Sequence, residues 1–316
     1  MTSDRLIPAA SLLLNPDQTA ERLPYPMLIR ELARLLVDST VQVPPRLVLP
    51  LNGGASLLVM PALDARTAIT KLITFTPGNA GSGRATIQGD VVVFDVASGE
   101  RKLVLDGPTV TARRTAAVSV LAAQRLAPCQ HGPVLIVGAG VQGQAHLQAF
   151  AETMAIGEFF IASRSAASAA RLVAYARSLG LKAQAVPDAN AALAECPMAV
   201  TCTPASAVVL SALPRNDGFI AAVGAFTPQM AELGPQLCRH FASHGIVVVD
   251  TLDAEQEAGD LLQAGLDVSR FASLADVVRK HDFSVGGPVL FKSCGWAGWD
   301  LAAARTALIQ PAGLPP

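Results

Sequence analysis

Three observations predict an α/β fold in which a doubly wound parallel sheet is joined to a second, β-rich α+β domain. A glycine-rich turn stands between an apolar strand-like run and a helix-like run at residues 133–154. After that turn, short apolar runs alternate with helical stretches, an order typical of a parallel sheet. Before it, residues 46–106 have the pattern of strands separated by turns. At 316 residues the chain is also longer than one hydrophobic core usually supports, so two domains are expected.

The glycine-rich turn predicts a dinucleotide site. Gly138, Gly140 and Gly143 follow an uncharged run in G-x-G-x-x-G spacing. The first glycine permits a tight turn, the second lets backbone approach a pyrophosphate, and the third lets the helix pack closely on the strand. The helix that begins near Val141 and Gln142 would point its N–H groups and positive dipole end at the phosphates. Glycine-rich turns are common elsewhere, but here both the strand and the helix of a Rossmann-like domain flank the turn.

The other elements follow from apolar periodicity and turn residues. Leucines recur at a helical period up to the prolines at 44 and 45, which are expected to end a helical region. The strands expected in the first half are 47–49, 56–60, 68–76, 91–94 and 102–105, followed by a helix over 109–127. The strands expected in the second half are 159–162, 182–186, 198–202, 219–223 and 245–249, with a helix ending at 179 and another over 296–308 before a proline-rich tail.

The composition argues against several classes of protein. Hydrophobic residues make up 51% of the chain and charged residues 16%, with a net charge of −1, so neither nucleic acid nor an anionic membrane is an expected partner. Mean hydropathy is +0.40, yet no apolar run approaches the roughly 18 residues needed to span a bilayer. Residues 1–5 lack the basic-then-apolar order of a signal peptide.

The cysteines and histidines indicate a cytoplasmic protein that binds no metal. The five cysteines are odd in number and none has C-x-x-C spacing, so neither a disulfide framework nor a zinc site is expected. His240 and His244 are four residues apart and can share a helix face, but no H-E-x-x-H motif accompanies them.

The end of the second strand of the predicted parallel sheet indicates which dinucleotide is bound. Proteins that take NAD place an acid there for the ribose 2′-hydroxyl, whereas an arginine accommodates the 2′-phosphate of NADP. This chain has Ser163, Arg164 and Ser165 at that point and no acid. Charge-assisted hydrogen bonds from Arg164 and the flanking hydroxyls favour NADP(H) over NAD(H). The alternative is that Arg164 is a solvated loop residue.

Lys71 is a candidate anion-binding residue because of the strand around it. Alternation places Lys71 on the face that also carries Ile69, Ile73 and Phe75. A desolvated ammonium on an apolar face is costly unless an anion or acceptor meets it. The alternative is that the long side chain reaches solvent at a sheet edge.

Three arginines extend this set of cations. Arg113 and Arg114 are expected in the first turns of the helix at 109–127, where a cation opposes the macrodipole by about 0.3–1 kcal/mol. A bound anion would reverse that penalty. Arg46 follows two prolines and opens an apolar strand, although alone it would be assigned to the surface. Together with Lys71, these residues predict a carboxylate pocket facing a nicotinamide.

Several motifs along the chain also match a known family. They are Pro45-Arg46, Lys71 with Pro77-Gly78-Asn79, Thr111 to Ala117, Gly138 to His146, Thr203-Pro204, Val223-Gly224 through Glu232-Leu233, and Phe291 to Gly295 followed by Asp300. In this order they make the chain similar to the ornithine cyclodeaminase/mu-crystallin family over nearly its whole length. The resemblance implies that Arg46, Lys71 and Arg114 bind a substrate carboxylate, with Lys71 near the reacting nitrogen.

The resemblance also implies a domain organisation and a partner. A substrate-binding and dimerisation domain would comprise residues 1–118 with 297–316, and the Rossmann domain residues 119–296. The first domain would form the interface of a homodimer, with the C-terminal helix returning to it. Beyond the glycine-rich turn, the resemblance places Thr203, Pro204, Gly224, Ser293 and Gly295 at the cofactor.

Two positions indicate the branch of the family. Cyclodeaminases and the related alanine dehydrogenases carry an Asp two residues after Val223-Gly224, where this chain has Phe226. A phenyl ring can neither pair with a substrate amine nor activate water, and it would instead pack against an apolar ring. The cyclodeaminases also hold NAD through an acid at the second strand. Both departures resemble the NADP(H)-dependent branch that reduces the cyclic ketimines Δ1-pyrroline-2-carboxylate and Δ1-piperideine-2-carboxylate.

The mechanism expected from this resemblance is direct. Arg46 and Arg114 hold the carboxylate, and Lys71 donates a hydrogen bond or proton toward the imine or its carboxylate. Reduced nicotinamide supplies a hydride to give L-proline or L-pipecolate. Met60 and Thr115 would line the pocket, with ordinary core packing an equal alternative. Two other functions stay open: ornithine or lysine cyclodeamination, and cofactor-bound binding without catalysis, as in the crystallin.

Overall fold

A computed structural model describes residues 12–79, 82–204, 207–280, 283 and 286–309. The first residues of the predicted helical region and most of the proline-rich tail lie outside these residues. The chain divides into two compact units. The first unit comprises Met1–Glu31, Asp38–Arg114 and Ala297–Pro316, and the second comprises Leu32–Val37 and Thr115–Trp296. The division passes through two helices. In the later helix it lies between residues 114 and 115, a few residues before the boundary at 118 that the sequence predicts; in the earlier one it assigns Leu32–Val37 to the second unit, where the sequence prediction had them in the first domain.

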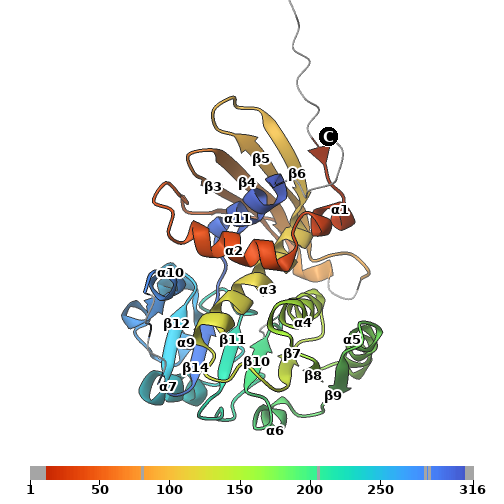
Figure 1. The fold of residues 1–316 in the computed structure, drawn as a ribbon, viewed down its shortest axis with the longest axis vertical. Coiled ribbons are helices and arrows are strands. Elements are labelled where there is room, and N and C mark those ends of the chain that lie inside the picture. The colour runs from red at the N-terminus through yellow and green to blue at the C-terminus, as the bar shows by residue number, and fades with distance from the viewer. Residues whose placement is uncertain (1–11, 80–81, 205–206, 281–282, 284–285, 310–316) are drawn as a thin grey trace, which may run out of the picture. The chain divides into compact units, whose positions relative to one another are not determined.

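The first unit contains a six-stranded sheet in the order β1-β6-β5-β4-β3-β2 (Figure 1). Its strands are β1 (Leu12–Leu13), β2 (Leu47–Pro50), β3 (Ser56–Leu63), β4 (Thr67–Phe75), β5 (Ile87–Asp95) and β6 (Arg101–Asp106). Strands β2 to β6 pair antiparallel, and β1 joins β6 in parallel. The alternation predicted for β4 is present, because Ile69, Lys71 and Ile73 are all buried.

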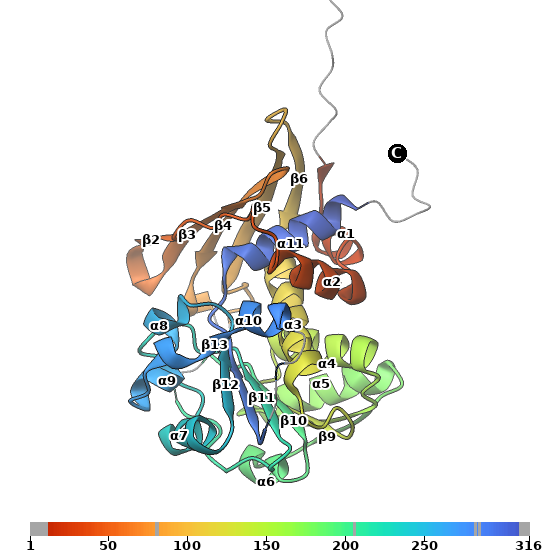
Figure 2. The ribbon, with the colours of Figure 1, turned by 60° about the vertical axis from the view of Figure 1, so that its left-hand side comes forward.

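Within the described residues, four helices belong wholly or partly to this unit: α1 (Pro16–Glu21), α2 (Tyr25–Leu35), the first part of α3 (Gly107–Leu126) and α11 (Ala297–Leu308). Helix α11 packs against β3, β4 and β5 (Figure 2). Its buried face is rich in alanine, so the helix lies close to the sheet. Near its end, Arg305 forms ion pairs with Glu31, Asp38 and Asp64 at 3.3, 2.7 and 2.6 Å. These contacts anchor the last helix within the first unit.

The second unit is built on an eight-stranded sheet in the order β13-β12-β14-β11-β10-β7-β8-β9, with every pairing parallel. Its strands are β7 (Val134–Val137), β8 (Glu158–Ala162), β9 (Lys182–Ala185), β10 (Met198–Thr201), β11 (Phe219–Ala222), β12 (Ile246–Val249), β13 (Ala272–Ser273) and β14 (Val289–Lys292). The chain starts in the middle at β7, moves outward to β9, and then returns to the other side of β7. This reversal confirms the predicted doubly wound sheet.

Helices cover both faces of the parallel sheet, as Figure 2 shows. The helices are α3 (Gly107–Leu126, shared with the first unit), α4 (Val141–Met154), α5 (Ala166–Ser178), α6 (Ala189–Leu193), α7 (Pro235–His244), α8 (Ala254–Glu257), α9 (Gly259–Gln263) and α10 (Leu274–Arg279). A buried cluster joins α6, α7 and α9 to one face of the sheet, through residues such as Leu193, Phe241 and Leu261. Within the described part of the chain, no helix is both long and apolar enough to cross a membrane.

The differences from the predicted elements lie mainly at boundaries. Helix α2 ends at Leu35, well before the prolines at 44 and 45 that the sequence suggested as its end. Helix α3 begins at Gly107, because the Asp106 carboxylate accepts hydrogen bonds from the N–H and hydroxyl of Thr109. Strand β14 and helix α7 were not predicted as elements.

Candidate active-site residues

Lys71 lies in the middle of strand β4, with neighbouring strands on both sides. Met60 of β3 and Val91 of β5 are its direct partners in the sheet. Only 1% of the Lys71 side chain is accessible, and Met60 is also buried. The alternative in which Lys71 reaches solvent at a sheet edge is therefore wrong.

The buried ammonium of Lys71 faces a carboxylate from the other end of the chain. Asp300, in the first turn of α11, places Oδ2 2.8 Å from Lys71 Nζ and Oδ1 3.4 Å from Arg114 Nε. Asp300 is fully buried, and among the described residues neither of its oxygens receives a well-directed hydrogen bond. We call Lys71, Arg114 and Asp300 the cation cluster.

The cation cluster carries more positive than negative charge. Burial lowers the pKa of Lys71 from 10.5 to about 8; the Asp300 carboxylate opposes this shift, while Arg114 and Arg46 add to it. Arg46 is partly buried and near enough for its charge to be felt at Lys71. Three of the predicted carboxylate-binding side chains thus belong to one electrostatic group in the first unit.

The arginines differ from the prediction in one respect. Because α3 begins at Gly107, Arg114 lies beyond its first turns, so the macrodipole argument for Arg114 is wrong. Its placement beside Asp300 is what marks it as part of a charged site. Arg113 has a structural role, since its Nε donates to the Leu23 carbonyl and its guanidinium stacks on Tyr25 at 4.0 Å.

The glycine-rich turn has the geometry that each of its glycines predicted. Gly138 has φ +118°, a backbone conformation that suits glycine, and it directly follows β7. A Cβ on Gly143 would overlap the carbonyl oxygen of Gly138, so only glycine lets the helix pack this closely. A Cβ on Gly140 would meet no atom within 4 Å, which leaves its backbone open to a ligand. Gly140 is also the N-cap of α4, and Val141 at the helix start is 70% exposed.

The serine–arginine–serine segment follows the second strand of the sheet. Arg164 is exposed and is the second residue after β8, while Ser165 caps helix α5 by accepting from the Ser168 N–H. No hydrogen bond or ion pair from another described residue holds the Arg164 side chain. No acidic residue stands at this strand end, and the Arg164 side chain is available to bind a ligand there.

The other predicted cofactor residues gather at the same edge of the sheet. Thr203 and Pro204 follow β10, Gly224 follows β11, and Ser293 and Gly295 follow β14. The parallel register aligns the carboxyl ends of these strands with the end of β7. Ligands of open α/β sheets bind outside this edge, at the point where the strand order reverses.

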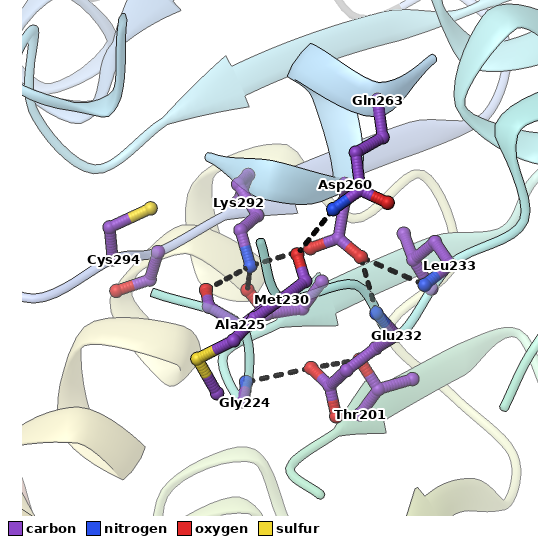
Figure 3. Close-up of polar contacts among 12 residues, drawn as sticks. Thr201, Gly224, Ala225, Met230, Glu232, Leu233, Asp260, Gln263, Lys292 and Cys294 are labelled. Atoms are coloured by element: carbon purple, nitrogen blue, oxygen red, sulfur yellow. Dashed lines mark hydrogen bonds and ion pairs between the residues drawn. The ribbon is translucent and has the colours of Figure 1, made fainter. Parts of the chain in front are cut away.

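A buried glutamate links two of these strand ends. Glu232 Oε1 accepts from the Thr203 N–H and hydroxyl at 2.6 and 2.9 Å. Its Oε2 accepts from the Thr201 hydroxyl at 2.9 Å and the Gly224 N–H at 2.7 Å (Figure 3). Burial raises the pKa of Glu232, although Lys292 opposes this shift. Four donors thus converge on one carboxylate, and they tie Thr203 to Gly224.

A second buried ion pair supports the glutamate. Asp260 Oδ1 accepts from the N–H groups of Glu232 and Leu233 at 2.6 and 2.8 Å, and Oδ2 lies 2.8 Å from Lys292 Nζ. Lys292 Nζ also donates to the Ala225 carbonyl at 2.6 Å (Figure 3). Burial lowers the pKa of Lys292, but the carboxylates of Asp260 and Glu232 outweigh it and the net shift is upward. We call Glu232, Asp260 and Lys292 the carboxylate cluster.

Asp250 performs a similar task for the last predicted cofactor residues. Its Oδ2 accepts from the Ser293 hydroxyl at 2.7 Å and from the N–H groups of Cys294 and Gly295 at 3.0 and 2.9 Å. Asp250 and Asp260 were not among the site residues predicted from the sequence. Asp250 could have been predicted, because it is an acidic residue directly after the apolar run of β12. No comparable sequence pattern points to Asp260.

The two remaining pocket candidates belong to the second unit. Phe226 is partly buried and packs against the cluster between the sheet and α6, α7 and α9. Thr115 is buried in α3, where its carbonyl accepts from the Ser119 hydroxyl. Ser119 in turn lies 2.9 Å from His146 Nε2, and burial lowers the pKa of His146 to about 4, so this histidine is neutral.

These features define a protein with a Rossmann-type dinucleotide-binding fold and a separate group of buried cations. The chain belongs to the ornithine cyclodeaminase/mu-crystallin family, whose sequence profile matches residues 26–308. The resemblance predicted from the motifs is thereby confirmed.

Relatives of this chain carry names that describe ketimine reduction. It is 40% identical over 300 residues to Delta(1)-pyrroline-2-carboxylate reductase 1 of Burkholderia multivorans, with 92% of each chain covered. It is 38% identical over 297 residues to the Delta(1)-pyrroline-2-carboxylate/Delta(1)-piperideine-2-carboxylate reductase of Azospirillum brasilense, again with 92% of each covered. Among solved structures, the Thermococcus litoralis Delta(1)-pyrroline-2-carboxylate reductase in complex with NADH and L-proline has a TM-score of 0.86 at 23% identity, covering 94% of this chain and 96% of that one. This last likeness shows the shared fold.

Proposed function

We propose that this protein is an NADPH-dependent reductase of cyclic ketimines, which converts Δ1-pyrroline-2-carboxylate and Δ1-piperideine-2-carboxylate to L-proline and L-pipecolate. Of the relatives at 38–40% identity, one is named for the first of these substrates and the other for both. The observation that carries the proposal is the cation cluster: a wholly buried lysine whose one polar contact among the described residues is the Asp300 carboxylate.

The cation cluster suits a small anionic imine. Arg114 and Arg46 supply positive charge for the carboxylate, and the N–H donors of Lys71 that Asp300 does not engage can reach the imine nitrogen. With a pKa near 8, Lys71 is an ammonium at neutral pH and is acidic enough to give up a proton. In the reaction the C=N carbon gains a hydride, the nitrogen gains a proton, and NADPH becomes NADP⁺.

The proposed cofactor fits the edge of the parallel sheet. NADPH supplies the hydride when bound; the open backbone at Gly140 and the start of α4 suit its pyrophosphate. Arg164 and the hydroxyls of Ser163 and Ser165 suit a 2′-phosphate, because no acid stands at the end of β8. Glu232 and Asp250 hold the backbone of Gly224 and Gly295, which we place at the nicotinamide end.

The absence of an acid at position 226 favours reduction over deamination. Phe226 has no group that could pair with the side-chain amine of ornithine or lysine. Met60 borders Lys71 on the neighbouring strand, and its apolar side chain suits the methylene groups of a ring. Thr115 is buried in α3, and we propose that this residue of the second unit also lines the substrate pocket.

We also propose a cytoplasmic homodimer formed through the first unit. Edge strand β2 presents Leu47, Val48 and Leu49 at 51, 49 and 42% exposure, an apolar run that soluble proteins normally cover. All five cysteines are unpaired, which suits a reducing compartment. Light scattering should give twice the mass of one chain, and Val48→Lys should give monomers. A monomeric wild-type protein would contradict the dimer.

One assay tests the reaction and its rivals together. Purified protein is given NADPH or NADH with each cyclic ketimine, and with L-ornithine or L-lysine. We expect NADPH oxidation with the ring imines, one imino acid formed per NADPH, and no ammonia from the diamino acids. Ammonia release without net NADPH consumption would instead show cyclodeamination. A protein that binds NADPH but turns over none of these compounds would be a binding protein.

Cofactor choice has its own test. Arg164→Ala should reduce the preference for NADPH over NADH by about tenfold, since one charge-assisted contact to the 2′-phosphate is lost. The matched control is Arg171→Ala on α5, because the Arg171 guanidinium is engaged by Ser168. An unchanged NADPH preference in Arg164→Ala would remove Arg164 from the cofactor site.

A further inference from the structure

Asp300 is bonded differently from three buried carboxylates of the second unit, Glu232, Asp250 and Asp260. Asp250 and Asp260 accept hydrogen bonds from backbone N–H groups, and Glu232 has four donors. Asp300 is equally buried, yet its polar contacts among the described residues are the two ion pairs with Lys71 and Arg114. A carboxylate that serves the fold alone is normally held by directed hydrogen bonds.

The position of Asp300 makes it part of the substrate-binding charge. It stands between Lys71 and Arg114, and with Arg46 the group has three cations and one anion. Without Asp300, three positive charges would face one another in a desolvated space. With it, the group keeps a net charge of about +2, which a substrate carboxylate would lower to about +1.

We infer that Asp300 is a positioning residue for Lys71: it fixes the direction of the ammonium and keeps it charged until a substrate carboxylate arrives. The inference rests on the proposed function, because it assigns Lys71 as the proton donor to the imine. Helix α11, anchored near its end by Arg305, holds Asp300 in place.

The charge balance makes a prediction about pH. In the free protein, the groups that face Lys71 among the described residues are Asp300 from α11, Arg114 from α3 and Arg46 before β2. Burial and the combined charges of these three groups lower the pKa of Lys71 to about 8. A bound substrate adds a second negative charge and raises that pKa. The alkaline loss of kcat/KM, which reports the free protein, should therefore begin near pH 8, and that of kcat at higher pH.

Asp300→Asn tests the inference, because it removes the charge and keeps the shape. The alkaline limb of kcat/KM should move down by about 1 to 3 pH units, since the one anion that favours the ammonium is lost. Asp260→Asn is the matched control: it makes the same change beside the other buried lysine and should leave the limb in place. A limb in Asp300→Asn that coincides with the wild-type limb would overturn the inference.

A second variant covers the case in which Asp300→Asn does not fold. Asp300→Ala leaves a space that formate can fill, and added formate should restore turnover where formamide does not. No response to formate would count against the inference.

Failure of the proposed function is distinguishable from failure of this inference. If the wild type turns over neither ring imine, the proposed function fails. Lys71 is then titrated directly by the pH dependence of its labelling with acetic anhydride, read by peptide mass spectrometry. The midpoint should lie near pH 8 in the wild type and lower in Asp300→Asn; equal midpoints would overturn the role of Asp300.

Discussion

The two units each contain a fully buried lysine 2.8 Å from a fully buried aspartate, and the two pairs differ in everything around them. Lys71 meets one carboxylate and two arginines, whereas Lys292 meets two carboxylates and two backbone carbonyls. The pKa therefore falls to about 8 at Lys71 and rises at Lys292. The same pair of residues can be a reactive group or a structural one, and the neighbouring charges decide which.

The largest expected effect separates the two lysines by turnover. Lys71→Met should reduce kcat/KM for a cyclic ketimine by at least about 100-fold, because both the proton donor and a carboxylate partner are lost. NADPH binding, followed by fluorescence, should change little. Turnover close to the wild-type value would remove Lys71 from the chemistry and with it the distinction between the two pairs.

For the free energy of unfolding we expect the opposite ranking: replacing Lys292 should cost more than replacing Lys71. Lys292→Met leaves Asp260 buried without its cation and should lower the free energy of unfolding by about 3–5 kcal/mol. Lys71→Met should cost less, since Arg114 remains beside Asp300. Guanidinium unfolding of both variants checks this ranking, and a reversed ranking would show that Lys71 is the structural lysine.

The sequence was sufficient for the fold where apolar runs were unbroken. Strands β7, β8, β10, β11 and β12 contain no internal charge, and each was predicted within a residue or two. Strand β14 was missed because it ends in Lys292, a charge that only the packed structure explains. The start of α3 was misplaced because the cap is Asp106, in the preceding strand.

The sequence allowed individual site residues to be predicted, but it did not show which residues they contact. Lys71 was found from alternation along β4, and the glycine turn from its spacing. The partner of Lys71 could not be inferred that way, because Asp300 lies on a helix far along the chain. Asp260 was equally out of reach, since its role depends on where α9 meets the loop that carries Glu232.

Glu232 provides a smaller test of the carboxylate cluster. Glu232→Gln would place an amide N–H₂ against two of the four donors, so we expect a loss of about 1–3 kcal/mol of stability and weaker NADPH binding. Thr201→Val is the control, because it removes a single donor and should cost about 1 kcal/mol. Equal losses in both variants would show that the convergence of four donors is unimportant.

The two lysines should also differ in how they make unfolding depend on pH. Between about pH 8 and the ordinary lysine value of 10.5, folded Lys71 has released its proton while the unfolded chain still holds it, so this group makes stability rise with pH. Folded Lys292 holds its proton more tightly than the unfolded chain, so its stabilisation is lost as pH rises through its raised pKa. Denaturant titrations of wild type, Lys71→Met and Lys292→Met are run from about pH 8 to above 10.5. The stability difference between wild type and Lys71→Met should rise with pH below 10.5, and the difference between wild type and Lys292→Met should fall with pH above 10.5. Parallel trends would contradict the assigned charge environments.

The most direct test of the cation cluster is a crystal structure with NADP⁺ and L-proline bound. The proposed function predicts the proline carboxylate within about 3.2 Å of the Arg114 or Arg46 guanidinium, and the ring nitrogen nearest to Lys71 Nζ. Proline bound away from Lys71, with the ammonium in contact with Asp300 alone, would contradict it.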